Sequence, residues 1–271
     1  MSRIDQLFAD LRRQKRKALM PFVTAGDPDL AFTADVIVEL DRRGATLCEV
    51  GIPYSDPIAD GPVIQASYTR ALSPKNPAHK IKVSAILDML RDVSGQVKMP
   101  LVTMVSYAIV HRYGLAKYVA DAQAAGICGA IVPDLLVEEA DELTRICKAA
   151  DFSLIQLVTP TTPRERAVRI ARSSTGFLYY VSVTGITGER TELPATLVDN
   201  VAWLRTQTDL PICIGFGISQ PAHVKLLAPV ADGLIVGSAI VRRVAEAATR
   251  PSDAVRTDVG TYAASLLAAL A

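Results

Sequence analysis

Two carboxylates, Glu49 and Asp60, stand where an apolar run of the sequence enters a loop rich in proline and glycine. The run before Glu49, residues 45–48, is short, apolar and partly β-branched, which is typical of a strand buried on both faces. A carboxylate at the end of such a strand is costly unless it has a partner or takes part in chemistry. Together the two side chains could serve as a general acid and a general base. A structural ion pair at Glu49 and a turn or helix cap at Asp60 are the other interpretation.

Three turns of small residues in the last third of the chain indicate an anion site. They are Thr187-Gly188, Gly215-Phe216-Gly217 and Gly237-Ser238, and each follows a predicted strand. Glycine lets backbone N–H groups approach a ligand closely, and the last turn leads into a short predicted helix whose N-terminus favours negative charge. One such turn alone is equally well explained as a tight turn. Three of them in register with successive strands predict a phosphate held mostly by backbone amides.

Aromatic residues are expected around the same place. Phe22 ends a predicted strand, Tyr179 lies in another, and Phe216 belongs to one of the glycine turns. A flat aromatic substrate fits between such rings, although Phe22 and Tyr179, taken singly, are more often core residues. The polar segment 185–192 carries glycines and adjoins the site, as a closing lid does.

Apolar, β-rich runs recur through the whole chain and alternate with segments of helical period. The runs cover residues 19–23, 46–50, 101–105, 129–132, 154–158, 177–181, 211–214 and 234–236. The helical segments include residues 32–40, 63–72, 115–125, 137–149, 164–171 and 197–204. This alternation predicts an α/β fold, a single (β/α)8 TIM barrel, and an amphipathic stretch around Phe8 adds an extra N-terminal helix. No linker divides residues 1–271, so one domain is expected, with its site at the C-terminal ends of the strands.

Proline and glycine mark several helix boundaries. Helices are expected to start at Asp27-Pro28, Thr162-Pro163 and Gln220-Pro221, and to stop at Gly44, Gly114 and Gly126.

Composition excludes several classes of protein. The 29 basic and 28 acidic side chains leave a net charge of +1, which does not indicate nucleic-acid binding. The basic run 12–17 is interpreted as a solvated helix end rather than a polyanion site. The four cysteines and three histidines are scattered, so neither a metal site nor a disulfide framework is expected. No membrane span or signal peptide is evident, and a cytoplasmic protein is expected.

The segment from Glu49 to Gln65 closely resembles the signature of the tryptophan synthase α-subunit family, with Tyr54 at the aromatic position. The resemblance extends over nearly the whole chain, including the last two glycine turns and residues 132–135. Some positions depart from the family pattern. Ser106 and Ala108 replace a frequent tyrosine and asparagine, Leu136 replaces a proline, and Val183 stands where arginine is common.

The resemblance implies cleavage of indole-3-glycerol phosphate to indole and glyceraldehyde 3-phosphate by retro-aldol chemistry, a lyase step of tryptophan biosynthesis. Asp60 would engage the indole N–H, while Glu49 would protonate C3 and accept the hydroxyl proton. The aromatic residues and glycine turns named above would bind the substrate. No cofactor is implied for this chain. The implied partner is a pyridoxal-phosphate-dependent β-subunit in an α2β2 heterotetramer, contacted through an exposed Asp56-Pro57.

Three alternatives remain open at this point. The chain could be a stand-alone indole-releasing lyase of the same family, which free-enzyme turnover would distinguish. It could be a subunit that mainly activates its partner, although both carboxylates are present. It could also be another phosphate-binding barrel, such as a sugar-phosphate isomerase, which would lack an indole-sized aromatic pocket.

Overall fold

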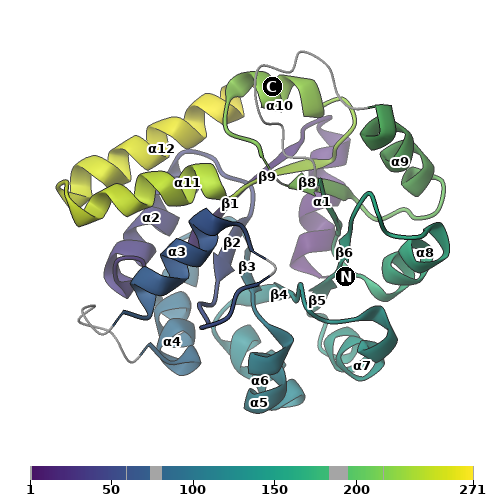
Figure 1. Cartoon of the computed structure of the whole chain (residues 1–271), viewed down its shortest axis with the longest axis horizontal. Coiled ribbons are helices and arrows are strands. Elements are labelled where there is room, and N and C mark those ends of the chain that lie inside the picture. Colours follow the sequence, from purple (N-terminus) through teal and green to yellow (C-terminus); the bar gives the residue numbers. More distant parts are fainter. Residues whose placement is uncertain (1, 59, 74–80, 183–194, 216, 271) are drawn as a thin grey trace.

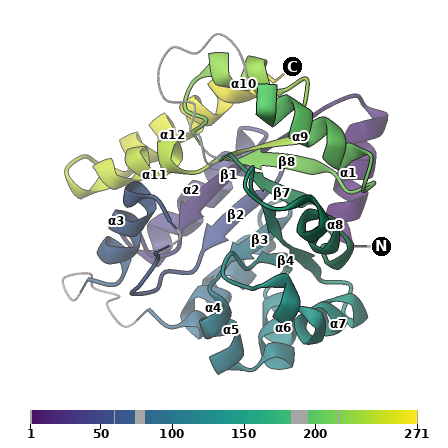
Figure 2. The same ribbon diagram turned by 45° about the vertical axis from the view of Figure 1, so that its right-hand side comes forward.

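A computed structural model of the chain describes residues 2–58, 60–73, 81–182, 195–215 and 217–270. Its strands form a central ring with the helices arranged around it, as in a parallel α/β barrel of the TIM type (Figures 1 and 2). The predicted fold class is therefore confirmed.

One parallel sheet contains all the strands of the described residues, in the order β5-β4-β3-β2-β1-β9-β8-β7-β6. The strands are β1 (Ala18–Thr24), β2 (Cys48–Gly51), β3 (Leu101–Met104), β4 (Ile127–Ile131), β5 (Ser153–Ile155), β6 (Leu157–Val158), β7 (Leu178–Val181), β8 (Ile212–Gly215) and β9 (Gly233–Val236). Only Gln156 separates β5 from β6, so the two ends of the sheet meet in one segment and the barrel closes there. The strands are almost wholly buried, because helices cover them outside and side chains fill the barrel inside.

The helices surround this barrel. They are α1 (Arg3–Arg13), α2 (Leu30–Arg42), α3 (Pro62–Ala71), α4 (Val83–Ser94), α5 (Tyr107–Tyr113), α6 (Leu115–Ala124), η1 (Val137–Glu139), α7 (Asp141–Ala149), α8 (Arg164–Ser173), α9 (Ala195–Arg205), α10 (Pro221–Leu227), α11 (Ser238–Val244), η2 (Ala245–Ala248) and α12 (Ser252–Ala268). Helix α1 lies behind the strands in Figure 1. Its residues Ile4, Phe8 and Leu11 pack with the side chains that fill the barrel interior, so α1 covers one end of the barrel.

Most predicted boundaries are confirmed. Among those that differ, the helical segment predicted at 137–149 is divided at Ala140 into η1 and α7. Every one of the eight apolar runs overlaps a strand, but the fifth run is split by Gln156 into β5 and β6. The expected helix start at Asp27-Pro28 is wrong by two residues, because Asp29 is the N-cap of α2 and accepts a 2.7 Å hydrogen bond from the Phe32 amide. Asp27 instead binds Arg70. The three glycines predicted to end helices, Gly44, Gly114 and Gly126, all have positive φ angles, a conformation that glycine favours.

Helix hydropathy, ionisable clusters and thiols characterise the described residues further. None of their helices has the length and hydropathy that a bilayer span requires. They also contain no group of three or more His, Cys, Asp or Glu side chains placed to hold a metal ion. The four cysteines are free thiols; Cys48, Cys147 and Cys213 are buried and Cys128 is half-buried.

Candidate active site

Strand β2 places Glu49 inside the barrel. In the parallel ladder Glu49 pairs with Phe22 of β1 and Val102 of β3, and its side chain is completely buried. Neither carboxyl oxygen has a hydrogen-bond partner among the described residues. Burial raises the pKa of Glu49 well above its ordinary value, because an apolar surrounding disfavours the charged form. A carboxyl in this environment can hold a proton and give it up to a reacting atom.

Asp60 lies in the loop between β2 and α3, in a different environment. The loop is tightly turned: the Asp60 amide donates to the Pro57 carbonyl at 3.0 Å, and Gln65 Nε2 donates to the Asp60 carbonyl at 2.7 Å. Burial, followed by repulsion from the Asp134 carboxylate, raises the pKa of Asp60 to about 6. Asp60 is thus ionised near neutral pH, whereas Glu49 is favoured in its neutral form, and such a difference separates acid and base roles.

Two tyrosines lie within the electrostatic reach of both carboxyls. Burial is the main cause of the raised pKa of Tyr68 and of Tyr179, and the charges of Glu49 and Asp60 raise both pKa values further. The loop that carries Asp60 follows β2, the strand that carries Glu49, and both charges act on the same two tyrosines. That the two carboxylates serve one catalytic site stays a prediction.

Aromatic rings pack closely against glycines at this mouth. A Cβ atom on Gly51 would lie 2.5 Å from Cζ of Phe22, and one on Gly215 would lie 2.8 Å from Cε1 and Cζ of Tyr179. Phe22 and Tyr179 are both buried, at 3% and 8% exposure. Glycine at positions 51 and 215 therefore leaves the space that the two rings occupy.

The predicted anion turns are only partly described. Gly215 ends β8 and is buried, and Gly217 has a φ of 78° and is exposed. Gly237 precedes α11 and Ser238 begins it, both half-buried. Because β8 and β9 are paired parallel strands, the turns that follow them lie at the same end of the barrel. Thr187, Gly188 and Phe216, with Val183 and the expected lid at 185–192, lie outside the described residues.

The expected partner-contact pair differs in exposure. Asp56 is exposed as predicted, but Pro57 is buried, so its predicted exposure is wrong. The reason is the turn itself, since the Pro57 carbonyl accepts from the Asp60 amide and from Gln65 Nε2. Ile58 is 92% exposed instead, and Leu136, after β4, is 52% exposed. They are the two large hydrophobic side chains that stand out as exposed among the described residues.

Sequence reasoning missed Asp134 as a site residue. Asp134 follows β4, and its carboxylate accepts hydrogen bonds from Ser106 Oγ at 2.6 Å and from the Tyr107 amide at 2.7 Å. Its charge raises the pKa of Asp60 and of Tyr54. The rule that residues after barrel strands are functional, applied to β4, would have identified it.

Sequence reasoning also missed Tyr68. The sequence places it only in a short predicted helix, residues 63–72, yet it is 1% exposed and packs in a cluster with Phe22, Ile64 and Val241 at the barrel mouth. The helical spacing of apolar residues in α3 indicates that one face is buried. It does not show which part of the protein that face contacts.

Comparison with known proteins supports one family throughout. The family model described as tryptophan synthase alpha chain matches residues 8–267. The tryptophan synthase alpha chain of Rhodopirellula baltica is 60% identical over 266 residues, covering 97% of this chain and 94% of that protein. Tryptophan synthase subunit alpha from Legionella pneumophila has a TM-score of 0.89 at 34% identity, covering 100% of this chain and 98% of that chain. A chain of tryptophan synthase from M. tuberculosis in an aminoacrylate-bound form has a TM-score of 0.84 at 28% identity, covering 98% of this chain and 100% of that chain.

Proposed function

From the premise that this chain belongs to the tryptophan synthase alpha chain family and cleaves indole-3-glycerol phosphate, we propose that Glu49 and Asp60 carry out the proton transfers of that cleavage. The observation that carries the proposal is the buried Glu49 carboxyl without a hydrogen-bond partner among the described residues, on the strand that leads into the loop of a second carboxyl, whose pKa is about 6. A buried acid without a structural partner costs stability, so its place is better explained by chemistry than by packing.

The reaction breaks the bond between indole C3 and the first side-chain carbon. Glu49 gives its proton to C3, and the resulting carboxylate accepts the proton of the side-chain hydroxyl as that carbon becomes the aldehyde. Asp60, as a carboxylate, accepts a hydrogen bond from the indole N–H and stabilises the positive charge that develops on the ring. The products are indole and glyceraldehyde 3-phosphate, and Glu49 ends the cycle with a proton again.

Substrate binding is proposed at the residues predicted from the sequence. Phe22 and Tyr179 would flank the indole ring together with Phe216. Backbone amides at Gly217, Gly237 and Ser238, with those at Gly215, Thr187 and Gly188, would hold the phosphate. Support comes from the adjacent β8 and β9 strands, whose following loops are the usual phosphate site of this barrel.

The family's α chain uses no cofactor of its own, and pyridoxal phosphate belongs to the β subunit. Solved structures of whole tryptophan synthase imply a β-subunit partner for chains of this kind. We propose an α2β2 heterotetramer in which Asp56 and Ile58, on the loop that carries Asp60, contact the β subunit. An exposed apolar side chain such as Ile58 is typical of a surface that a partner covers. The free thiols fit a cytoplasmic location, which is a proposal here as well.

The direct test is to incubate the purified chain with indole-3-glycerol phosphate and to quantify both products, with and without a β subunit. We expect equimolar indole and glyceraldehyde 3-phosphate, a low rate for the isolated chain, and acceleration when the β subunit is added. Equal rates alone and in the mixture, with separate elution on gel filtration, would favour a stand-alone lyase. Acceleration of the partner without any product from this chain would indicate a mainly activating subunit.

A further inference from the structure

The side chain of Tyr68 reaches from helix α3 into the barrel mouth. It is 1% exposed, and its hydroxyl oxygen lies 2.9 Å from the position that a Cβ atom on Gly51 would occupy. Gly51 and Glu49 are two positions apart on β2, so both face the barrel interior. The Tyr68 hydroxyl therefore fills the interior position next to the Glu49 carboxyl along the strand.

This hydroxyl also lies close to the second carboxylate. Burial raises the pKa of Tyr68 well above its ordinary value, and the charges of Asp60, Tyr54 and Glu49 raise it further. The phenol consequently keeps its proton throughout the working pH range and can donate that proton in a hydrogen bond. The ring of Tyr54 packs against the ring of Tyr68 at 5.6 Å between centroids and helps to hold it.

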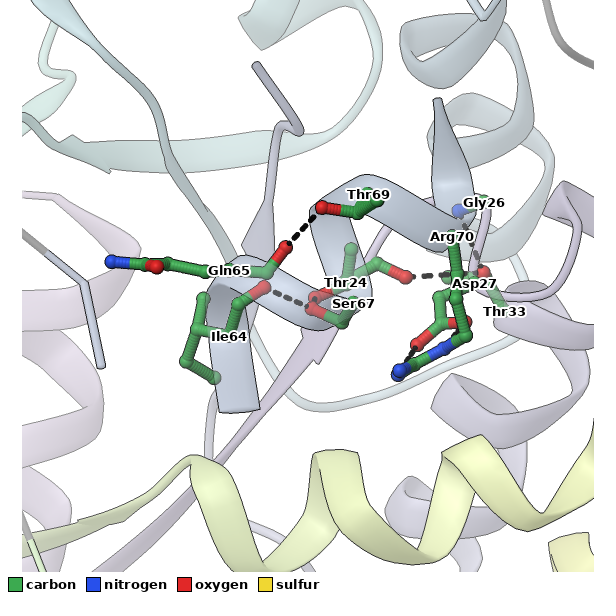
Figure 3. Close-up of polar contacts among 9 residues, drawn as sticks. All are labelled: Thr24, Gly26, Asp27, Thr33, Ile64, Gln65, Ser67, Thr69 and Arg70. Carbon is green, nitrogen blue, oxygen red and sulfur yellow. Dashed lines mark hydrogen bonds and ion pairs between the residues drawn. The ribbon is translucent and has the colours of Figure 1, made fainter. Parts of the chain in front are cut away.

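Helix α3 is fixed so that Tyr68 must point inward. Immediately before Tyr68, Ser67 Oγ forms a 2.6 Å hydrogen bond with Thr24 Oγ1 at the end of β1 and donates to the Ile64 carbonyl at 2.7 Å (Figure 3). Two residues after it, Arg70 donates from Nε and Nη2 to the two carboxylate oxygens of Asp27 at 2.9 and 2.7 Å (Figure 3). These contacts on either side of Tyr68 prevent the helix from rotating about its axis. A donor held by such contacts needs little reorganisation when charge develops beside it.

We propose that Tyr68 is a further catalytic residue, whose hydroxyl donates a hydrogen bond to the substrate hydroxyl oxygen from which Glu49 accepts a proton. The inference rests on the proposed roles of Glu49 and Asp60. Negative charge grows on that oxygen as its proton leaves, and a neutral donor beside it stabilises the transition state more than the bound substrate. Tyr68 gives up no proton, so the proton balance of the reaction is unchanged.

The test compares Tyr68→Phe with the native chain in the presence of the β subunit. The substitution removes one oxygen and keeps the ring, so we expect an unchanged Tm and a fall in kcat of about tenfold to a hundredfold with little change in KM. Tyr180→Phe is the matched control. Tyr180 is the neighbour of Tyr179 on β7, is also buried, and its hydroxyl accepts from Asn200 instead of facing the site.

Two further measurements make the result specific. An indole-3-alkyl phosphate without side-chain hydroxyls should inhibit the native chain and Tyr68→Phe equally, because the proposed acceptor is missing from it. A crystal structure of Glu49→Gln with bound indole-3-glycerol phosphate should place Tyr68 Oη about 2.5–3.2 Å from the substrate hydroxyl. This structure decides the matter even if Tyr68→Phe folds poorly.

The outcomes separate the inference from the function on which it rests. Native kcat and KM in a folded Tyr68→Phe protein, or a substrate hydroxyl out of reach of Tyr68 in the crystal, would overturn the role of Tyr68 alone. Full activity of Glu49→Gln would instead remove the premise, whatever Tyr68→Phe shows.

Discussion

Phe22 of β1 and Glu49 of β2 lie side by side in the parallel ladder, and both side chains face the barrel interior. The ring of Phe22 also packs over Gly51, the next interior position of β2. Apolar surface thus covers the carboxyl of Glu49 where water would otherwise reach it, and burial is the cause of its raised pKa. The residue proposed to bind the indole ring is therefore also one of the residues that bury the acid.

The buried acid should make the stability of the protein depend on pH. Because the pKa of Glu49 is higher in the folded than in the unfolded chain, its contribution to stability is complete below about pH 4.3 and is lost as the pH rises through its folded-state value. Glu49→Gln has no proton to lose at this position. We expect the Tm of the variant, relative to the native chain, to increase between about pH 5 and about pH 8.

Thermal unfolding at several pH values measures this difference. Glu142→Gln, which removes an exposed carboxylate from α7, is the control for the loss of one negative charge. Parallel Tm curves for Glu49→Gln and the native chain would show that Glu49 does not hold its proton in the folded state.

The second prediction concerns the acid limb of the rate profile. Asp60 acts as a carboxylate, and burial together with the Asp134 charge raises its pKa to about 6. The value of kcat/KM should therefore fall about tenfold per pH unit below that value. Asp134→Asn keeps an acceptor for the Tyr107 amide but removes the charge, so the limb should move to lower pH. Asp60→Asn should depress turnover strongly at every pH. If the acid limb of kcat/KM stays at the same pH in Asp134→Asn, the Asp134 charge is not a cause of the raised pKa of Asp60.

The third prediction tests the phosphate site. Gly217 has a positive φ, so Gly217→Val costs about 1–3 kcal/mol of backbone strain and places a side chain where the phosphate would approach. We expect a higher KM for the substrate. Gly44→Val is matched in backbone strain but lies at the end of α2, and it should leave KM unchanged. Ser238→Ala should act mildly because the amide remains. If soaked crystals show sulfate or phosphate bound elsewhere while the turns at Gly217, Gly237 and Ser238 are empty, the proposed phosphate site is contradicted.

A fourth prediction concerns the β subunit. Ile58 is 92% exposed in this chain, and covering it in a complex is worth about 1.5–3 kcal/mol. Ile58→Ser should therefore weaken binding of the β subunit about tenfold to a hundredfold without lowering the Tm of the isolated chain. Ile58→Val keeps most of the apolar surface and should bind nearly as the native chain does. Titration calorimetry distinguishes these cases, and native affinity in Ile58→Ser would place the interface elsewhere.

The barrel could be predicted from the sequence because its strands are buried on both faces and read as apolar runs. The split of the fifth strand at Gln156 could not be predicted, because a single residue between two short strands does not change the apolar pattern of the run. The helix start at Asp27 was misplaced because its carboxylate binds Arg70, 43 positions away, and local sequence does not show that contact.

The candidate site was predictable where residues stand near the end of a strand or in the loop that follows it, as Glu49 and Asp60 do. The position of Tyr68 at the site and the burial of Pro57 could not be predicted from the sequence, and the physical reason is the same for both. The direction of a helix face and the inner side of a turn are set by contacts with other elements, such as Thr24 with Ser67. A periodic pattern shows that a face is buried, but only the packed structure shows what it meets.

The most direct test of the account is the turnover of indole-3-glycerol phosphate by Glu49→Gln in the presence of a β subunit. The variant keeps the shape of the side chain but cannot donate or accept the proton, so indole release should fall by about a hundredfold or more. Circular dichroism and co-elution with the β subunit show that the variant is folded and assembled. Near-native turnover in such a protein would contradict the assignment of Glu49 as the proton-transfer group.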